Sequence, residues 1–235
     1  MSKKRSKRYQ KAAELVGTDK SYSLADAIST VKKLPAPKFI PTVTLSFKLG
    51  VDPRKSDQMV RGSVSLPHGT GKNVRVVVFA QGAAAEAAIA AGAEHVGYED
   101  LIKKVQEGFV DFDSAIATPD AMAEVRKIAR VLGPRGLMPN PKTGTVTDDV
   151  AKAVTEVKAG RIDYKLDKNG NISGAIGKAD FDEAKLAENA RAFLDSVVRA
   201  KPASAKGNFV QTVTLAASML PGLLIEASAY AKATA

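Results

Sequence analysis

The sequence contains no cysteine and no tryptophan, and its only histidines are His68 and His95. Without cysteine there can be no disulfide, thiolate nucleophile or cysteine-ligated metal. Two isolated histidines do not provide the ligand set of a zinc site, so neither a metal nor a cofactor is expected. No apolar run reaches the ~18 residues of a membrane-spanning helix, and the basic N-terminus lacks the apolar stretch of a signal peptide. We therefore expect a soluble, cytoplasmic protein with no membrane partner.

The motifs of nucleotide-dependent enzymes are also missing. The nearest match to a P-loop, HGTGK at 68–72, has Leu66 where the first glycine belongs and Asn73 in place of Ser or Thr. The segment QGAAAEAA at 81–88 has one glycine, whereas a dinucleotide-binding turn needs three. The paired acidic residues at 111 and 113 and at 148 and 149 stand beside turn or cap signals, which favours capping and solubility. No catalytic residue and no enzymatic activity is predicted.

Positive charge is what the sequence does contain. Lysine and arginine number 35 against 25 acidic residues, a net charge of +10. Residues 69–159 hold 11 basic and 12 acidic residues, so the excess lies in the remainder, with 24 basic and 13 acidic. Such an excess indicates a polyanionic partner, with solubility alone as the alternative. The basic arm at residues 3–11 has the same two interpretations, a nucleic-acid tail or a solvated end.

The two ends of the chain share one type of pattern. Residues 42–49 and 209–218 alternate apolar and polar side chains, as in antiparallel strands with one buried face. The segment 161–176 is predicted to form a hairpin with a type I′ turn at Asn169-Gly170. Residues 182–200 form an amphipathic helix pattern, and 222–227 could pair with the preceding strand. Together these elements predict an α+β domain.

The middle of the chain has a different pattern. Residues 74–80 are a continuous β-branched run, typical of a parallel strand covered on both faces. Alternating helix and strand signals follow, with Thr118 and Thr147 as expected helix caps, which predicts a three-layer α/β domain. We therefore expect a discontinuous α+β domain, residues 1–68 plus 160–235, with an α/β domain, 69–159, inserted in it. The expected hinge residues are Pro67, His68, Gly69 and Gly160.

The polar faces of the two alternating strands are candidates for nucleic-acid binding. They are lined by small hydroxyl side chains and a lysine: Thr42, Thr44, Ser46, Lys48, Thr212, Thr214 and Ser218. Such a face can approach the shallow groove and the 2′-hydroxyls of RNA closely. An ordinary solvated sheet face is the alternative. Phe39 and Met219, at the strand ends, fit a core role and a base-stacking role equally well.

The segment GPRGLMPNPKTG at 133–144 cannot form a helix or strand, because prolines and glycines dominate it. Its positive charges are Arg135 and Lys142. We interpret it chiefly as a rigid edge, with RNA contact by these two residues as a second possibility. A competing hypothesis is an α/β enzyme that holds a phosphate-bearing substrate near this segment.

Four blocks carry a resemblance to a known family: SDQMVRGSVSLPHGTGK, GPRGLMPNPKTGTV, VKAGRIDYKLDKNG and the late AKG at 205–207. They are similar, in order, to the bacterial ribosomal protein of the mobile side stalk of the large subunit, the ribosomal L-one family. The resemblance implies an RNA-binding domain with a Rossmann-like insertion, in a protein that is part of the large ribosomal subunit and a monomer when free. It implies three RNA partners: large-subunit ribosomal RNA, the transfer RNA leaving the exit site, and the protein's own messenger, whose translation it represses. Carried over by position, the RNA-binding residues are Lys38, Phe39, Thr42, Lys165, Thr212, Ser218 and Met219.

The sequence departs from the family pattern at three places. Ile40-Pro41 replaces a usually acidic or small polar pair, Met59 stands where asparagine is usual, and Leu220 stands where glycine is usual. A glycine at 220 would let the backbone approach RNA closely, so Leu220 bears most on the contact at Ser218-Met219.

Overall fold

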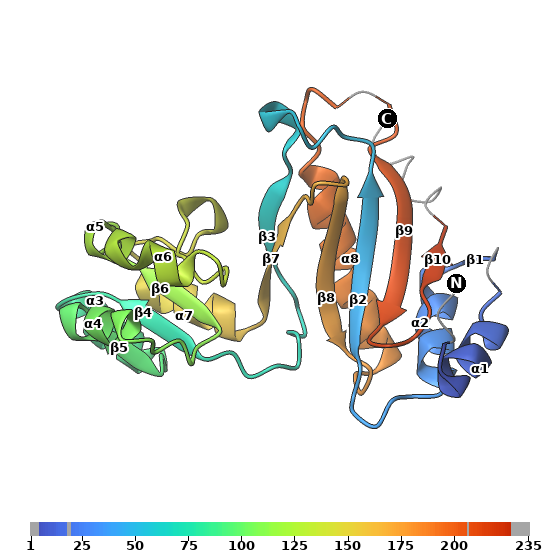
Figure 1. Ribbon diagram of the computed structural model, residues 1–235, viewed down its shortest axis with the longest axis horizontal. Helices are drawn as coiled ribbons and strands as arrows, with labels where there is room; N and C mark the ends of the chain where they lie inside the picture. The colour runs from blue at the N-terminus through green and yellow to red at the C-terminus, as the bar shows by residue number, and fades with distance from the viewer. Residues whose placement is uncertain (1–4, 18–19, 206, 227–235) are drawn as a thin grey trace. The chain divides into compact units, whose positions relative to one another are not determined.

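The computed structural model describes residues 5–17, 20–205 and 207–226. Its residues cluster into two compact units: unit 1 comprises 1–71 and 162–235, and unit 2 comprises 72–161. Both contain helices and strands (Figure 1), so the expected mixed α/β class is confirmed. That each unit folds as an independent domain stays a prediction.

Unit 1 is built on a five-stranded sheet with the strand order β1-β10-β9-β2-β8. All neighbours are antiparallel except β1 and β10, which are parallel. The predicted strand over 42–49 and its alternation are confirmed, because every second residue of β2 is buried. The pairing of 222–227 with the preceding strand is also confirmed. The strands are β1 Ser21–Tyr22, β2 Thr42–Leu49, β8 Asn171–Lys178, β9 Val210–Ala217 and β10 Leu223–Ile225.

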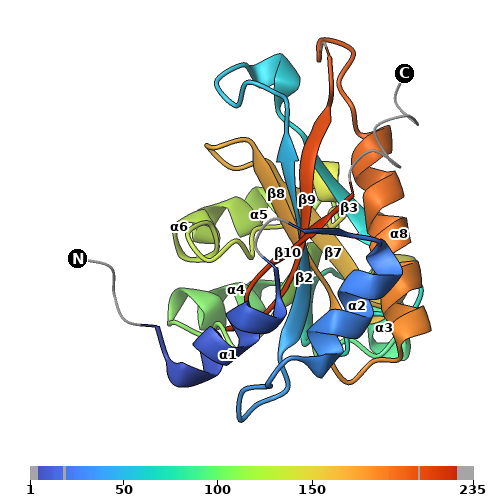
Figure 2. The ribbon, with the colours of Figure 1, turned by 90° about the vertical axis from the view of Figure 1, so that its right-hand side faces the viewer.

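Helices α2 and α8 pack against this sheet and against each other. Figure 1 shows α8 behind β8 and β2, and Figure 2 shows α2 and α8 next to each other. Phe193 of α8 lies at the centre of the core, edge-on to Phe47 at 5.2 Å between ring centroids. Gly174 of β8 makes room for it, since a Cβ there would lie 2.7 Å from the Phe193 ring. The helices of unit 1 are α1 Lys7–Leu15, α2 Leu24–Lys33 and α8 Glu183–Arg199.

A second sheet in unit 1 has two strands, β3 Arg61–Ser65 and β7 Arg161–Lys165, and follows the short 3-10 helix Ser56–Gln58. The predicted hairpin over 161–176 is wrong, because β7 pairs with β3 while β8 pairs with β2. A tight turn does form, with the Gly170 amide donating to the Asp167 carbonyl at 3.2 Å. Only Gly170 in this turn has a positive φ, so it is not type I′. Neighbouring residues are enough to predict the turn, whereas the pairing of β7 with β3 depends on contacts between residues far apart in the sequence.

Unit 2 has three layers. Its parallel sheet has the order β5-β4-β6, and β4 is buried along its whole length, as its β-branched run predicted. Helices α3 and α7 pack with one face of the sheet, and α4, α5 and α6 with the other. The strands are β4 Val76–Phe79, β5 His95–Gly97 and β6 Ser114–Ala117. The helices are α3 Ala83–Ala90, α4 Glu99–Gln106, α5 Met122–Val125, α6 Ala129–Leu132 and α7 Val150–Lys158.

Two expected helix starts in unit 2 are corrected by the structure. Helix α7 is capped by Asp149, whose carboxylate accepts from the Lys152 amide at 3.2 Å, and Thr147 instead accepts from the Asp149 amide. The helix expected from Thr118 begins only at Met122 and is divided by the 3-10 turn Arg126–Ile128. Thr118 still accepts a hydrogen bond, from the Ala121 amide at 3.4 Å.

Candidate RNA interface

The two polar strand faces identified in the sequence lie side by side. The register of β2 with β9 sets Thr44 against Ala216, Ser46 against Thr214 and Lys48 against Thr212. The apolar residues of both strands are buried on the side of α2 and α8. The other side therefore presents one continuous surface of small polar groups.

Strand β8 extends this surface, which the sequence reasoning missed. Its residues Asn171, Ser173 and Ala175 face Lys48, Ser46 and Thr44 in the register. The hydroxyls of Ser46 and Ser173 lie 2.9 Å apart and share a hydrogen bond. We call the whole surface the polar face; its residues are Thr42, Thr44, Ser46, Lys48, Asn171, Ser173, Ala175, Thr212, Thr214 and Ala216.

Two segments distant in the sequence meet at one end of the polar face. Ser218, after β9, donates its amide to the Thr42 carbonyl at 3.0 Å, and its hydroxyl lies 3.4 Å from the same oxygen. Phe39 and Met219 are 49% and 68% exposed, which decides against a core role for either. Lys38 is exposed as well, and Thr212 is exposed on β9. Six of the seven residues carried over from the family pattern thus lie on the polar face or at this end of it, Lys165 being the exception.

The turn after β9 explains the departure at Leu220. Its side chain is buried in the core of unit 1, and its amide donates to the Ala217 carbonyl at 2.9 Å. Met219 takes the left-handed conformation in this turn, with φ 60°. The backbone position that glycine would suit is therefore 219 rather than 220.

Lys165 lies elsewhere in unit 1. It is exposed on β7, in the two-stranded sheet, and borders a groove with Met59 and Lys168. Next to it Asp167 accepts from the amides of Asn171 at 2.7 Å and Asn169 at 2.8 Å. These bonds, the one from Asn171 first, hold the pKa of the Asp167 carboxyl below its ordinary value. Lys165 thus stands on β7, just before the turn that leads to Asn171 of the polar face.

The expected hinge residues include two that are fastened to α8 within unit 1. The buried amide of Asn189 accepts from the His68 amide at 3.1 Å and donates to the Gly69 carbonyl at 3.0 Å. The His68 ring contacts the Glu188 carboxylate at 2.6 Å. Pro67 is exposed, and Gly69 and Gly160 both have positive φ, at 65° and 103°. Sequence reasoning missed Asn189, because a polar residue inside an amphipathic helix pattern gives no sign of its partners.

Arg135 and Lys142 belong to unit 2. Arg135 is exposed, and the side chain of Lys142 lies outside the described residues. The segment around them is held by buried threonines: Thr145 accepts from the Asn140 amide at 2.8 Å, and Thr143 donates to the Asn140 carbonyl at 3.1 Å. These bonds support the interpretation of 133–144 as a rigid edge.

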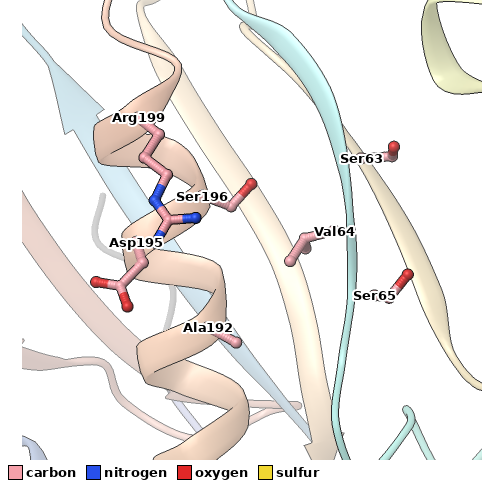
Figure 3. A pocket seen from close by; sticks show the side chains of 7 residues that line it. All are labelled: Ser63, Val64, Ser65, Ala192, Asp195, Ser196 and Arg199. Atoms are coloured by element: carbon pink, nitrogen blue, oxygen red, sulfur yellow. The ribbon is translucent and has the colours of Figure 1, made fainter.

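Besides the groove beside Lys165, the described residues line two hollows whose chemistry does not suit a phosphate. The groove between β3 and α8, about 400 Å³, has Val64 pointing toward α8 while Ser63 and Ser65 point to the far side of β3 (Figure 3). Its hydroxyls therefore do not converge. The second hollow, about 200 Å³, lies at the carboxyl ends of the unit 2 strands, where such folds bind ligands, but it is lined by Asp120 and Asp148. Two carboxylates repel a phosphate group.

The described residues contain no group of three His, Asp or Glu side chains that could hold a metal ion. None of the described helices is both long and apolar enough to span a membrane.

The sequence profile of the Ribosomal protein L1p/L10e family matches residues 29–221. Similar proteins named "Large ribosomal subunit protein uL1" include one from Mycolicibacterium smegmatis, 58% identical over 96% of both chains. Another from Mycobacteroides abscessus is 57% identical over 95% of both, and one from Thermobifida fusca 53% identical over 98% of both. These relatives bear the name of a ribosomal protein and not of an enzyme, in agreement with the expectation from the sequence.

Proposed function

Because this chain belongs to the ribosomal protein L1p/L10e family, we propose that it is a component of the large ribosomal subunit that binds ribosomal RNA. It acts in the cytoplasm, on the ribosome, and is a monomer when free. The observation that carries this proposal is the meeting of residues 38–42 with 218–219 at one end of the polar face.

The chemistry of that end suits a folded RNA. Phe39 and Met219 offer apolar surface on which an unstacked base can lie, and Lys38 offers a charge to a nearby phosphate. Thr42, Thr212 and Ser218 supply hydroxyls that can exchange hydrogen bonds with 2′-hydroxyls. Apart from Lys48, the side chains of the polar face are short, so a rigid sheet can approach the ribose-phosphate surface closely.

Two finer roles follow from the family resemblance. The chain assists release of deacylated transfer RNA from the exit site, with Arg135 and Lys142 of unit 2 as candidate contacts. It also represses translation of its own messenger, which presents an RNA structure similar to the ribosomal site. In this scheme Pro67, His68, Gly69 and Gly160 form the hinge between the RNA-binding unit and the inserted one.

The test is a titration of the full chain with a large-subunit ribosomal RNA fragment that contains the side-stalk helix. A parallel titration with an RNA duplex of equal length is the control. We expect binding to the fragment at least about 10³ times tighter than to the duplex, a typical ratio of specific to non-specific affinity for nucleic-acid-binding proteins. The messenger leader should compete with the fragment for the same site. Equal affinity for fragment and duplex would refute specific recognition, and simultaneous binding of fragment and leader would refute a shared site.

A further inference from the structure

Arg8 of α1 joins the two segments that meet at the end of the polar face. Its Nη1 donates to the Pro35 carbonyl at 3.4 Å, and its Nη2 donates to the Met219 carbonyl at 3.2 Å. Pro35 lies in the segment that leads to Lys38 and Phe39, and Met219 follows β9. One guanidinium thus bridges two segments on either side of the candidate RNA site.

The bridge depends on the shape of the arginine side chain. A guanidinium presents its donors in a fixed planar fork, so it can serve two carbonyls at once. A lysine ammonium carries the same charge on a single atom and cannot occupy both donor positions. On the same helix, Lys7 and Lys11 are exposed and donate no side-chain hydrogen bond to the described residues.

Helix α1 is itself well placed to hold Arg8 still. Ala12, one turn further along, is completely buried in the core of unit 1. Ser6 caps the helix by accepting from the Tyr9 amide at 3.3 Å. The backbone around Arg8 is therefore held by the Ser6 cap before it and by the buried Ala12 after it.

The turn that Arg8 holds needs support from outside. Met219 has φ 60°, a conformation that residues with a side chain adopt rarely. The turn closes through a single backbone bond, from the Leu220 amide to the Ala217 carbonyl at 2.9 Å, and is tied to β2 by the Ser218 amide. A charge-assisted hydrogen bond to the Met219 carbonyl fixes the peptide that follows this residue.

We propose that Arg8 is a positioning residue for RNA binding: it sets the turn with Ser218 and Met219 against the segment with Lys38 and Phe39. In this role α1 is part of the RNA site's framework rather than only a basic tail. The inference rests on the proposed RNA-binding function.

The test compares Arg8→Lys, which keeps the charge and removes the fork, with Lys11→Gln, which removes a charge from the same helix and leaves the bridge. Affinity for the ribosomal RNA fragment is measured at low and high salt. Arg8→Lys should weaken binding by about tenfold at both, because the lost hydrogen bonds position the site. Any weakening by Lys11→Gln should disappear at high salt, since exposed charges are then screened. A defect of Arg8→Lys that is absent, or that disappears at high salt, overturns the proposal.

Hydrogen exchange in the RNA-free protein separates positioning from a direct contact with a phosphate. Arg8→Lys should speed exchange of the Leu220 and Ser218 amides and leave the amides of α8 unchanged. Unchanged exchange at 218–220 would mean that Arg8 touches RNA itself, and faster exchange throughout α8 would make it a general stabiliser. A variant that no longer unfolds cooperatively would also show that Arg8 is a general stabiliser. A direct RNA contact and a general stabilising role would each overturn the proposal. Failure of the wild-type chain to bind the fragment would refute the proposed function instead, because the exchange result does not involve RNA.

Discussion

Met219 is held in a backbone conformation that suits glycine, and its side chain is exposed. The left-handed conformation costs a residue with a side chain roughly 1–2 kcal/mol, and exposed Met219 recovers little of this by burial. Folding stability therefore does not explain why methionine occupies the position. The role in RNA binding that we propose for Met219 would explain it.

Replacing Met219 by glycine should separate the two effects. We expect Met219→Gly to leave the free energy of unfolding unchanged or to raise it by up to about 1 kcal/mol, because glycine adopts positive φ freely. RNA affinity should fall by up to about 1 kcal/mol, the lower end of the range for a base stacked on an aromatic side chain, because methionine offers apolar surface but no ring. Urea unfolding and RNA titration measure the two quantities. Unchanged affinity would show that Met219 does not contact RNA.

We expect Asp113 to make the stability of unit 2 depend on pH. Lys72 contacts its carboxylate at 2.5 Å and Arg75 at 3.3 Å, and the pKa of Asp113 is lowered from its ordinary 3.8, chiefly by the bond from Lys72. A carboxyl with a lowered pKa in the folded state contributes stability above the unfolded pKa, and this is lost as pH falls through the folded value. Melting temperatures of wild type and Asp113→Asn should therefore differ at pH 6, and the difference should shrink as pH falls below 3.8. A difference that persists at low pH would assign the effect to packing.

At the scale of single strands, the polar face should contribute to binding through Thr212, which is exposed on β9. Thr212→Val keeps the shape and the strand preference of the side chain and removes its hydroxyl. We expect affinity to fall by ~0.5–1.5 kcal/mol, the value of one neutral hydrogen bond, with an unchanged melting temperature. Thr155→Val, at an exposed threonine on α7 of unit 2, is the matched control and should bind as wild type does. If Thr212→Val and Thr155→Val bound RNA equally well, the polar face around Thr212 would be ordinary solvated surface that does not contact RNA.

Local patterns predicted β2, β4, β9, β10 and α8, because side-chain periodicity records which face is buried, whereas β1, β3, α1 and α2 were not predicted. Alternation fixed β2 and β9, and the β-branched run fixed β4. The pairing of β7 with β3 was missed, since the turn at Asp167–Gly170 looks the same whether or not its flanking strands pair. The cap of α7 was missed because Thr147, Asp148 and Asp149 are all acceptable caps, and only packing selects among them.

In the candidate site too, local patterns predicted single strands, whereas their pairing could not be predicted. Small hydroxyls on alternating strands indicated a polar face, and the register then showed that the two faces form one surface. The contributions of Ser173 and Asn171 could not be predicted, because they depend on β8 pairing with β2. Whether Phe39 and Met219 were core or surface residues was open in the sequence, since both lie just outside the strands, where alternation gives no information.

At the scale of the whole molecule, net positive charge outside residues 72–161 should make RNA binding sensitive to salt. With about five phosphate contacts, log K should fall with log salt with a slope of roughly −4. The slope is measured by repeating the RNA titration across a range of potassium chloride concentrations. A slope near zero would exclude an electrostatic contribution to the interface.

The central claim is that unit 1 carries the RNA site. The chain leaves unit 1 after β3 and returns on β7, the strand hydrogen-bonded to β3. We therefore expect that a short Gly-Ser linker can replace residues 72–161. Closing such a gap costs little, because loop entropy grows only logarithmically with length. The shortened chain keeps the polar face, α1 with Arg8, and 23 basic against 13 acidic residues.

The most direct measurement is the affinity of this shortened chain for the ribosomal RNA fragment, beside that of the full chain and of residues 72–161 alone. We predict that the shortened chain folds and binds within about tenfold of the full chain, or ~1.4 kcal/mol, and that residues 72–161 bind weakly or not at all. If affinity followed residues 72–161 instead, the RNA site would lie on unit 2, and the central claim would be contradicted.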